Sequence, residues 1–203
     1  MNPTPTPPVS AILLAGGEGR RMGGQDKGLI QLRGKPLAEW VLARIRPQAS
    51  EILISANRNL EAYEALGYPV VRDKTEGYVG PLAGIARGLL DASNDLVLSV
   101  PCDTPFLPDD LVARLYAALS NGDHDLAVPL AAGRTQNAIC LMRRNVGANL
   151  AIFLSQGGRK VMDWQAGLKL AVADFSDEAG YFVNINSPEQ LAALDAKGRH
   201  SNS

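Results

Sequence analysis

A glycine-rich loop with several basic residues is the first part of this sequence whose residue types suit chemistry. Five glycines fall within nine residues, at positions 16, 17, 19, 23 and 24. Glycines let backbone N–H groups approach a ligand closely, which is the usual means of binding phosphate. The stretch from Glu18 to Lys35 holds five basic and two acidic residues, a local charge of +3 in a chain of net charge −1. This pattern favours a polyphosphate ligand, and a solvated surface loop is the alternative.

Two well-known nucleotide-binding loops do not fit this stretch. A dinucleotide-binding fingerprint needs a third glycine where this chain has Met22, and an acidic residue after the second strand, which here ends in Ser55 and Ala56. A P-loop needs Gly-Lys followed by Ser or Thr, and the sequence contains no such run. The loop therefore predicts a different phosphate-binding arrangement.

A second candidate is the carboxylate of Asp103, which follows the apolar run 96–100 within Cys102-Asp103-Thr104-Pro105. A carboxylate at the exit of a buried strand is costly unless a cation or hydrogen-bond donors compensate it. Magnesium commonly uses one or two protein carboxylates and completes its coordination with water and substrate phosphates. Asp103 is therefore a candidate Mg²⁺ ligand, and an Asx-turn or helix cap is the alternative. We expect Cys102 to pack as a small apolar residue rather than act as a nucleophile.

Alternating strands and helices must position these groups. Apolar runs predict strands at 9–15, 51–55, 70–72, 96–100, 126–129, 138–142, 170–175 and 182–185. Helical periodicity predicts helices over 37–45, 82–89 and 111–119, and Ser187-Pro188-Glu189-Gln190 carries the N-terminal signals of a last helix. This order is typical of an α/β fold with a mostly parallel sheet flanked by helices. Ligands of such sheets bind outside the carboxyl ends of the strands. The glycine loop, Asn57-Arg58-Asn59, Arg72-Asp73 and Cys102-Asp103-Thr104 follow the first four strands, so we expect them to converge on one rim.

Composition excludes several other classes of protein. The 203 residues balance 20 basic against 21 acidic side chains, which speaks against a nucleic-acid binder. Two cysteines and two histidines exclude a disulfide scaffold and a zinc ribbon. No apolar stretch approaches the ~18 residues of a membrane helix, and no signal peptide is evident. We expect a soluble, cytoplasmic protein with one domain at 9–196 and disordered ends at 1–8 and 197–203.

Several motifs in a fixed order resemble those of the molybdenum cofactor guanylyltransferases, over roughly residues 9–195. They are Leu14-Ala15-Gly16-Gly17, Arg20-Arg21-Met22-Gly23, Asp26-Lys27-Gly28, Gly34-Lys35-Pro36-Leu37, Asn57-Arg58-Asn59, Gly80-Pro81-Leu82-Ala83-Gly84, Pro101-Cys102-Asp103-Thr104-Pro105 and Phe182-Val183-Asn184-Ile185-Asn186. The glycine loop alone would indicate only the wider nucleotidyltransferase superfamily. One departure is Ser55, where many members have asparagine, so we assign no role to that side chain.

The resemblance implies a Rossmann-like nucleotidyltransferase fold and a reaction. Mg²⁺-GTP and the molybdopterin-bound molybdenum cofactor would give the guanine dinucleotide cofactor and pyrophosphate, by direct attack of the pterin's phosphate on the GTP α-phosphorus. By family position, the GTP contacts would be Leu14, Ala15, Gly16, Gly17, Lys27, Asp73 and Asp103, with Asp103 also holding Mg²⁺. Catalysis would rest on Asp103, Lys27 and Arg21, because the two cations can neutralise charge on the triphosphate and the departing pyrophosphate.

The second substrate, a pterin with a phosphate, would bind in the half of the domain at 126–196, and the nucleotide in the half at 9–125. Candidate contacts are Arg159 and Lys160, ahead of a predicted helix, and Asn184 and Asn186, which would share one face of the last predicted strand. Weaker support comes from Gln136-Asn137. A solvated helix end and a pair of loop-supporting hydrogen bonds are the alternatives. The resemblance also implies transient contact with molybdenum-insertion proteins and apo-molybdoenzymes, and no contact with nucleic acid or membrane.

Other functions remain to be separated from this one. The alternatives are a cytidylyltransferase acting on the same cofactor, a sugar-phosphate or isoprenoid-precursor nucleotidyltransferase, and a nucleotide-binding regulator without catalysis. Cytidylyl relatives carry Leu-Ala-Ala-Gly where this chain has Leu14-Ala15-Gly16-Gly17. The glycine at position 16 therefore favours GTP as the nucleotide. Asp103 and Lys27 are both present, which favours an enzyme over a regulator.

Overall fold

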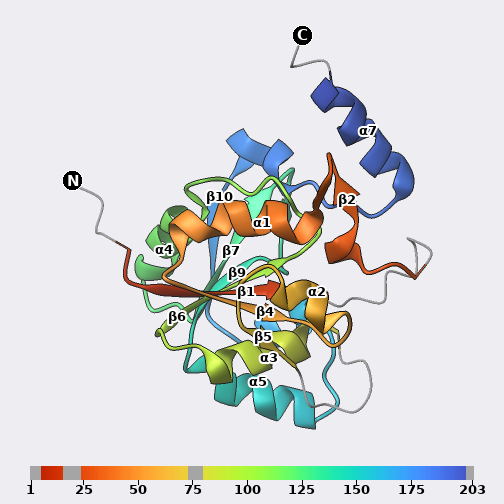
Figure 1. The fold of residues 1–203 in the computed structure, drawn as a ribbon. Coiled ribbons are helices and arrows are strands. Elements are labelled where there is room, and N and C mark those ends of the chain that lie inside the picture. Colours follow the sequence, from red (N-terminus) through yellow and green to blue (C-terminus); the bar gives the residue numbers. More distant parts are fainter. Residues whose placement is uncertain (1–5, 16–23, 73–79, 200–203) are drawn as a thin grey trace.

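An eight-stranded sheet forms the middle of the molecule in this computed structural model, which describes residues 6–15, 24–72 and 80–199. The strand order is β10-β7-β9-β6-β1-β4-β5, with β8 paired to β7 (Figure 1). The strands are β1 (Val9–Leu14), β4 (Glu51–Ser55), β5 (Val70–Val71), β6 (Leu96–Pro101), β7 (Leu126–Ala131), β8 (Arg134–Thr135), β9 (Cys140–Arg143) and β10 (Leu170–Asp174).

The sheet is mostly parallel, as predicted, and one central strand runs the other way. Strands β5, β4, β1 and β6 pair in parallel, and so do β7 and β10. Strand β9 is antiparallel to both of its neighbours, β6 and β7. A parallel crossover needs a dozen or more residues, whereas the chain goes from β7 to β9 through the short hairpin of β7 and β8. Its two turn residues, Ala132 and Gly133, both have positive φ, as a tight hairpin turn requires.

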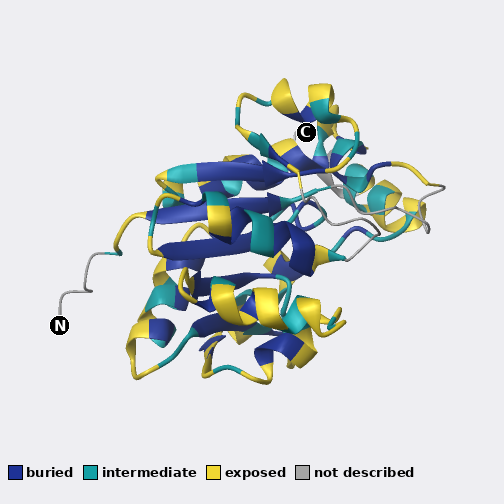
Figure 2. Cartoon of the chain, turned by 90° about the horizontal axis from the view of Figure 1, so that it is seen from below, coloured by how far each residue is buried: buried dark blue, intermediate teal, exposed yellow. Residues whose placement is uncertain are grey.

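Helices cover both faces of the sheet (Figure 1). Helices α1 (Leu37–Ile45) and α4 (Leu111–Ser120) pack on one face, and α3 (Pro81–Asp91), α5 (Val146–Ser155) and α6 (Val161–Gln165) on the other. Strand β1 alternates between the two cores, since Ala11 and Leu13 face the first and Ile12 the second. Figure 2 shows the result as buried strands between helices whose outer faces are exposed. The helices predicted at 37–45, 82–89 and 111–119 are confirmed.

The remaining elements complete the chain. They are η2 (Lys27–Leu29), β2 (Gln31–Leu32), β3 (Lys35–Pro36), η3 (Arg46–Gln48), α2 (Leu60–Glu64), η4 (Ser176–Phe182) and α7 (Pro188–Arg199). Helix α7 begins where the sequence predicts, and Ser187 Oγ accepts a hydrogen bond from Gln190 N at 3.3 Å. The helix continues past the expected domain end at residue 196, to Arg199. Its start packs against β2 and α1, with Leu191 and Leu194 beside a small core of Ile30, Leu32, Leu37 and Ile185.

The predicted strand at 182–185 is wrong. Phe182 ends η4, and the following residues pair with no strand in the described part of the chain. The alternating pattern has another cause, because Phe182 stacks edge-on against Phe175 at 5.2 Å and Ile185 fills the small core. The backbone N–H of Ile185 donates to the carbonyl of Asp103 at 2.9 Å, which attaches this segment to the loop after β6.

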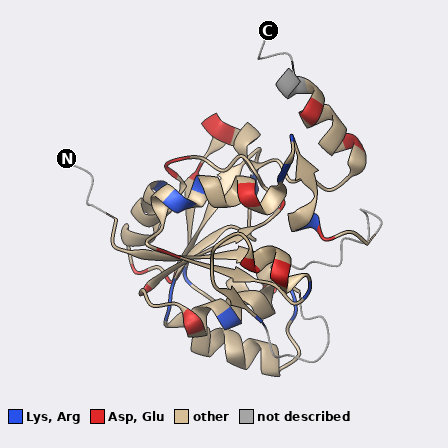
Figure 3. Cartoon of the chain, in the orientation of Figure 1, with Lys and Arg blue, Asp and Glu red and all other residues tan. Residues whose placement is uncertain are grey.

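Acidic and basic side chains are interspersed over the described surface, while the strands are nearly free of charge (Figure 3). Among the described helices, none has the length and apolar character needed to span a membrane.

The closeness of α3 to β1 gives a test of the fold. A Cβ on Gly88 would lie 2.1 Å from Ile12 Cδ1 and 2.5 Å from Ile12 Cγ1, and Ile12 is fully buried. We therefore expect Gly88→Ala to lower the free energy of unfolding by about 1–3 kcal/mol, as overpacking usually does. The matched control is Gly147→Ala in α5, whose Cβ would make only an ordinary 3.6 Å contact. Urea unfolding of both variants decides, and equal stabilities would contradict this packing.

Candidate functional site

The carboxyl ends of β1, β4 and β6 lie side by side and form the floor of the site. Ala15 N donates to Ser55 O at 2.8 Å, and Cys102 N donates to Leu14 O at 3.1 Å. The ends of the first, second and fourth predicted strands therefore share one edge of the sheet, whereas the glycine loop at 16–23 lies outside the described residues. Ser55 is buried and faces Gly84 of α3, where a Cβ would lie 2.6 Å from its hydroxyl. The predicted contacts Gly16, Gly17, Arg21 and Asp73 lie outside the described residues.

Lys27 and Asp103 meet above this floor. Lys27 begins η2, and its ammonium lies 3.0 Å from Asp103 Oδ2 and 2.5 Å from Asn186 Oδ1. The side chains of Lys27 and Asp103 are 21% and 14% exposed, so the pair is sheltered yet open to a ligand. Three segments far apart in the sequence thus bring a cation, an anion and an amide together.

The second carboxylate oxygen of Asp103 fits a metal ligand. Within the described part of the chain, Oδ1 is buried and has no hydrogen-bond partner. A buried carboxylate oxygen without a donor is costly, so a cation bound there would stabilise it. Among the described residues, no three His, Cys, Asp or Glu side chains are grouped so that they could hold a metal ion, so a cation at Asp103 would take most of its ligands from elsewhere. One carboxylate with water and phosphate oxygens suits Mg²⁺.

Cys102 takes no part in this chemistry. Its side chain is buried, and burial together with the neighbouring Asp103 carboxylate raises the pKa of the thiol far above neutral pH. The thiolate is the nucleophilic form of cysteine, so Cys102 packs as a small apolar residue, as expected.

The loop after β4 and helix α2 contact the residue that precedes Lys27. Arg58 and Asn59 reach Asp26, the residue before Lys27, with Asn59 Nδ2 donating to Asp26 Oδ2 at 3.0 Å. Tyr63 donates to the other oxygen of the same carboxylate. Sequence reasoning missed Asp26 and Tyr63 as site residues. The available signal was the position of Asp26 directly before the candidate Lys27. The sequence does not show that the side chains of Asp26 and Tyr63 are buried.

A cavity of about 470 Å³ opens beside Asn186. It is lined by Pro101, Ala132, Arg134, Thr135, Gln136, Asn137, Ala138, Ile139, Ala179, Phe182, Val183, Asn184, Asn186 and Gln190. Asn184 and Asn186 therefore reach one pocket without the strand that was expected to align them. Thr104 Oγ1 donates to Asn184 Oδ1 at 2.7 Å, which joins the cavity wall to the loop of Asp103. Arg134 brings a positive charge to this lining, and no motif in the sequence pointed to it.

The predicted pair Arg159 and Lys160 is not brought to this cavity. Both residues are exposed and neither lines it. The guanidinium of Arg159 instead donates to the carbonyls of Gly158, at 2.7 Å, and Leu154, at 3.3 Å. It thus caps the end of α5, which corresponds to the solvated helix end considered as the alternative.

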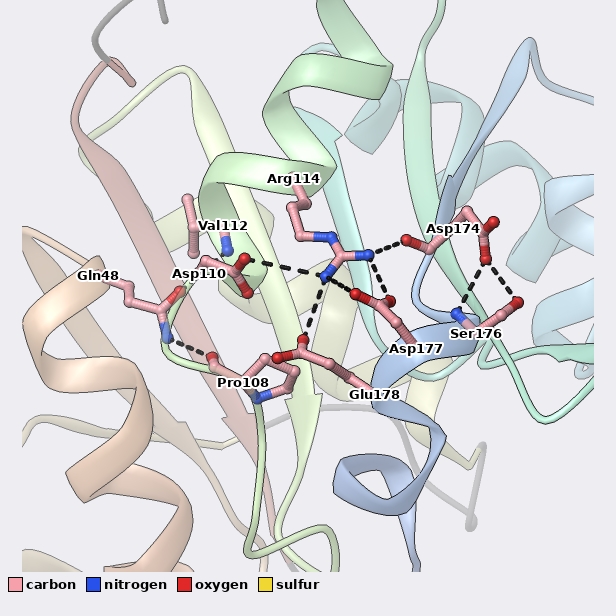
Figure 4. Close-up of polar contacts among 9 residues, drawn as sticks. All are labelled: Gln48, Pro108, Asp110, Val112, Arg114, Asp174, Ser176, Asp177 and Glu178. Carbon is pink, nitrogen blue, oxygen red and sulfur yellow. Dashed lines mark hydrogen bonds and ion pairs between the residues drawn. The ribbon is translucent and has the colours of Figure 1, made fainter.

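Arg114 of α4 contacts the end of β10 and the start of η4 (Figure 4). Its guanidinium lies 2.9 Å from Asp177 Oδ1 and 3.2 Å from Glu178 Oε2, and it donates to the carbonyl of Asp174. It also stacks over the ring of Phe175 at 3.9 Å. These contacts attach η4, which carries Ala179 and Phe182 into the cavity wall, to α4.

Known proteins are similar to this chain in both sequence and fold. The family model of the MobA-like NTP transferase domain matches residues 11–170. The molybdenum cofactor guanylyltransferase of Shewanella halifaxensis is 45% identical over 189 residues, which cover 93% of this chain and 94% of that protein. The protein of the same name from Shewanella amazonensis is 46% identical over 186 residues, covering 92% and 95%.

Solved structures give the same picture of the fold. Molybdopterin-guanine dinucleotide biosynthesis protein A from Archaeoglobus fulgidus superimposes with a TM-score of 0.77, at 24% identity, covering 95% of this chain and 99% of that chain. The 2-C-methyl-D-erythritol 4-phosphate cytidylyltransferase of Thermus thermophilus gives a TM-score of 0.71 at 26% identity, covering 95% and 99%.

The attachment of η4 by Arg114 can be tested by amide hydrogen exchange. In Arg114→Ala we expect the amides of 175–182 to exchange at least about fivefold faster. The reason is that local opening of this segment no longer has to break the ion pairs of Arg114, so opening costs less free energy. Arg87→Ala is the control, since Arg87 pairs with Asp91 inside α3. The Arg114 guanidinium lowers the pKa of Asp177 from its ordinary value of 3.8. The protection should therefore hold at pH 7 and disappear only as the pH falls below that value. Equal exchange in both variants would contradict the role given to Arg114.

Proposed function

This chain belongs to the molybdenum cofactor guanylyltransferases within the MobA-like NTP transferase family, and we propose that it transfers GMP from GTP to the phosphate of the molybdenum-bound molybdopterin cofactor. The products are the guanine dinucleotide form of the cofactor and pyrophosphate. The observation that carries this assignment is the identity with the guanylyltransferases along nearly the whole chain. The cytidylyl and isoprenoid-precursor alternatives are not favoured.

The nucleotide site is proposed to lie on the rim formed by β1, β4 and β6. The backbone at Leu14 and Ala15 leads into it, and Lys27 lies where its ammonium can bind the triphosphate. Gly16, Gly17, Arg21 and Asp73 remain predicted GTP contacts from the family motifs. Asp103 is the proposed ligand of Mg²⁺, supported by its buried Oδ1, which has no hydrogen-bond partner among the described residues.

The reaction needs positioning and charge stabilisation more than covalent chemistry. A phosphate oxygen of the pterin cofactor forms a bond to the α-phosphorus of GTP, while the bond from that phosphorus to the β-phosphate oxygen breaks and pyrophosphate leaves with its electrons. Lys27 can neutralise charge on the triphosphate and on the leaving group. Bound Mg²⁺ would supply further charge neutralisation at the phosphate oxygens. Asn186, in contact with Lys27, holds the ammonium toward this centre.

The cavity of about 470 Å³ is the proposed site of the pterin. Amide side chains offer both donors and acceptors, which matches the mixed N–H and carbonyl edge of a pterin. Four of them, Gln136, Asn137, Asn184 and Gln190, line the cavity together with Asn186. Because Asn186 contacts Lys27, a cofactor bound there would direct its phosphate toward the nucleotide. Arg159 and Lys160 lie outside this cavity, so contacts from them stay a prediction without structural support.

Further parts of the assignment are proposals of a more general kind. The cytoplasm is the proposed location, where the apo-molybdoenzymes that receive the product fold. Transient contacts with these enzymes and with molybdenum-insertion proteins are proposed for the same reason, because the product must be passed on. A role in nucleic-acid binding is not proposed, given the near-neutral charge of the chain.

Pyrophosphate release tests the function directly. With molybdenum cofactor and Mg²⁺ present, we expect release with GTP and at least about tenfold less with CTP at equal concentration, a ratio within the reach of one well-matched base contact. The control omits the cofactor. A preference for CTP would move the chain to the cytidylyl branch, and no release with any nucleotide would leave a binding protein without catalysis.

The role of Asp103 has its own test. Asp103→Asn keeps the shape of the side chain and removes its charge, so we expect turnover to fall at least ~100-fold, on the order of one electrostatic catalytic contact. The Mg²⁺ concentration needed for half-maximal rate should rise, while the melting temperature changes little. Asp109→Asn is the matched control, since Asp109 is 78% exposed and pairs with Arg44 on the surface. Near-normal rates in Asp103→Asn at ordinary Mg²⁺ would exclude the metal role.

A further inference from the structure

The carboxylate of Asp26 is held by hydrogen bonds on both of its oxygens. Its side chain is 3% exposed. Oδ1 accepts from the hydroxyl of Tyr63 at 2.6 Å and from the backbone N–H of Gly28 at 3.2 Å. Oδ2 accepts from Asn59 Nδ2 at 3.0 Å and lies 3.4 Å from Arg58 Nε. A buried carboxylate persists only with such compensation, so this cluster has a geometry that leaves little freedom.

Tyr63 enters this cluster through a gap that only glycine leaves. Its side chain is fully buried, and burial raises the pKa of the phenol, which therefore donates its hydrogen at any ordinary pH. A Cβ on Gly28 would lie 2.4 Å from the Tyr63 hydroxyl and 3.2 Å from two ring carbons. The Asp26-Lys27-Gly28 sequence thus has a physical reason at both outer positions, because aspartate accepts the hydroxyl and glycine makes room for it.

Lys27 is the residue between these two. Asp26 caps η2 by accepting from Gly28 N, which fixes the backbone on both sides of Lys27. The three side chains that contact Asp26 come from the loop and helix after β4, at 58–63. The direction in which the Lys27 side chain points is therefore set by the segment 58–63. Neither Asp26 nor Tyr63 is placed where it can touch phosphate, as both are buried.

We propose that Asp26 and Tyr63 are positioning residues for the nucleotidyl transfer: their buried hydrogen bond, allowed by Gly28, holds Lys27 toward Asp103 and the triphosphate. This inference rests on the proposed function, because it takes Lys27 to bind the triphosphate. The competing interpretation is that the cluster only stabilises the fold, as many buried polar groups do. The two differ in whether the effect of a change at Tyr63 depends on the presence of Lys27.

A double-mutant cycle separates these interpretations. Tyr63→Phe removes only the hydroxyl, and we expect kcat/KM for GTP to fall about tenfold, with a parallel loss of GTP affinity measured by calorimetry without the second substrate. In a Lys27→Ala background, the same Tyr63→Phe change should alter both quantities less than about twofold, since residues acting through one another are non-additive. Equal factors in both backgrounds, or no effect of Tyr63→Phe in the wild-type background, would overturn the proposal.

Three further variants check that the effect is specific to the hydroxyl of Tyr63 and the space left by Gly28. Tyr116→Phe, in α4 and away from the rim, makes the same chemical change and should leave kcat/KM unaltered. Gly28→Ala should lower kcat/KM more than Tyr63→Phe does, because its methyl displaces the whole phenol. Adding Tyr63→Phe to Gly28→Ala removes the closest clash and should recover part of the lost activity, up to the level of Tyr63→Phe alone.

The outcome can be told apart from a failure of the proposed function. If wild-type protein released pyrophosphate with CTP and not with GTP, the assigned nucleotide would be wrong, and the same cycle would be run with CTP. If it bound nucleotide without releasing pyrophosphate, the calorimetric cycle would still test the coupling between Tyr63 and Lys27. Additivity in that cycle would reject the positioning role in either case.

Discussion

The 3.0 Å contact between Lys27 and Asp103 joins the two charges on which the proposed chemistry depends. The two residues are 76 positions apart, and they meet because β1 and β6 are adjacent and parallel. The sheet places the aspartate directly, at the end of a strand. The lysine comes from a loop, so it needs support from Asp26 below and from Asn186 at the side. A rigid strand end and a braced loop thus provide the two charges by different means.

Much of the fold follows from sequence periodicity, and the exceptions have physical causes. The strands beginning at Val9, Glu51 and Leu96 are each buried on both faces, so their apolar runs identify them. The direction of β9 depends on the length of the connection before it, which periodicity does not report. At 182–185 the alternation of apolar and polar residues reflects anchoring of Phe182 and Ile185 in two separate cores, and no strand forms there.

Some residues of the candidate site could be predicted from the sequence and others could not. Lys27 and Asp103 were identifiable because charge beside glycine, and charge at a strand exit, both stand out in a sequence. Asp26 and Arg134 did not stand out, because their importance comes from neighbours contributed by distant segments. Arg159 and Lys160 are the opposite case, since two adjacent cations suggested a phosphate site although the chain directs Arg159 to the end of α5. Charged residues in a sequence predict a binding site correctly only where the fold directs their side chains into that site.

The reversed direction of β9 has a consequence for how the molecule can diverge. Because this strand runs against its neighbours, the segment that reaches the rim is the one before it, at 136–139, continuous with the hairpin of β7 and β8. That short stretch forms one side of the large cavity and contributes no side chain to the contact of Lys27 with Asp103. Under the proposed function, one part of the acceptor site is thus a contiguous stretch, whereas Asn186 joins the rest of the cavity to Lys27. Substitutions at 136–139 therefore alter one wall of the cavity while the hydrogen bonds of Lys27 to Asp103 and Asn186 keep all their side chains.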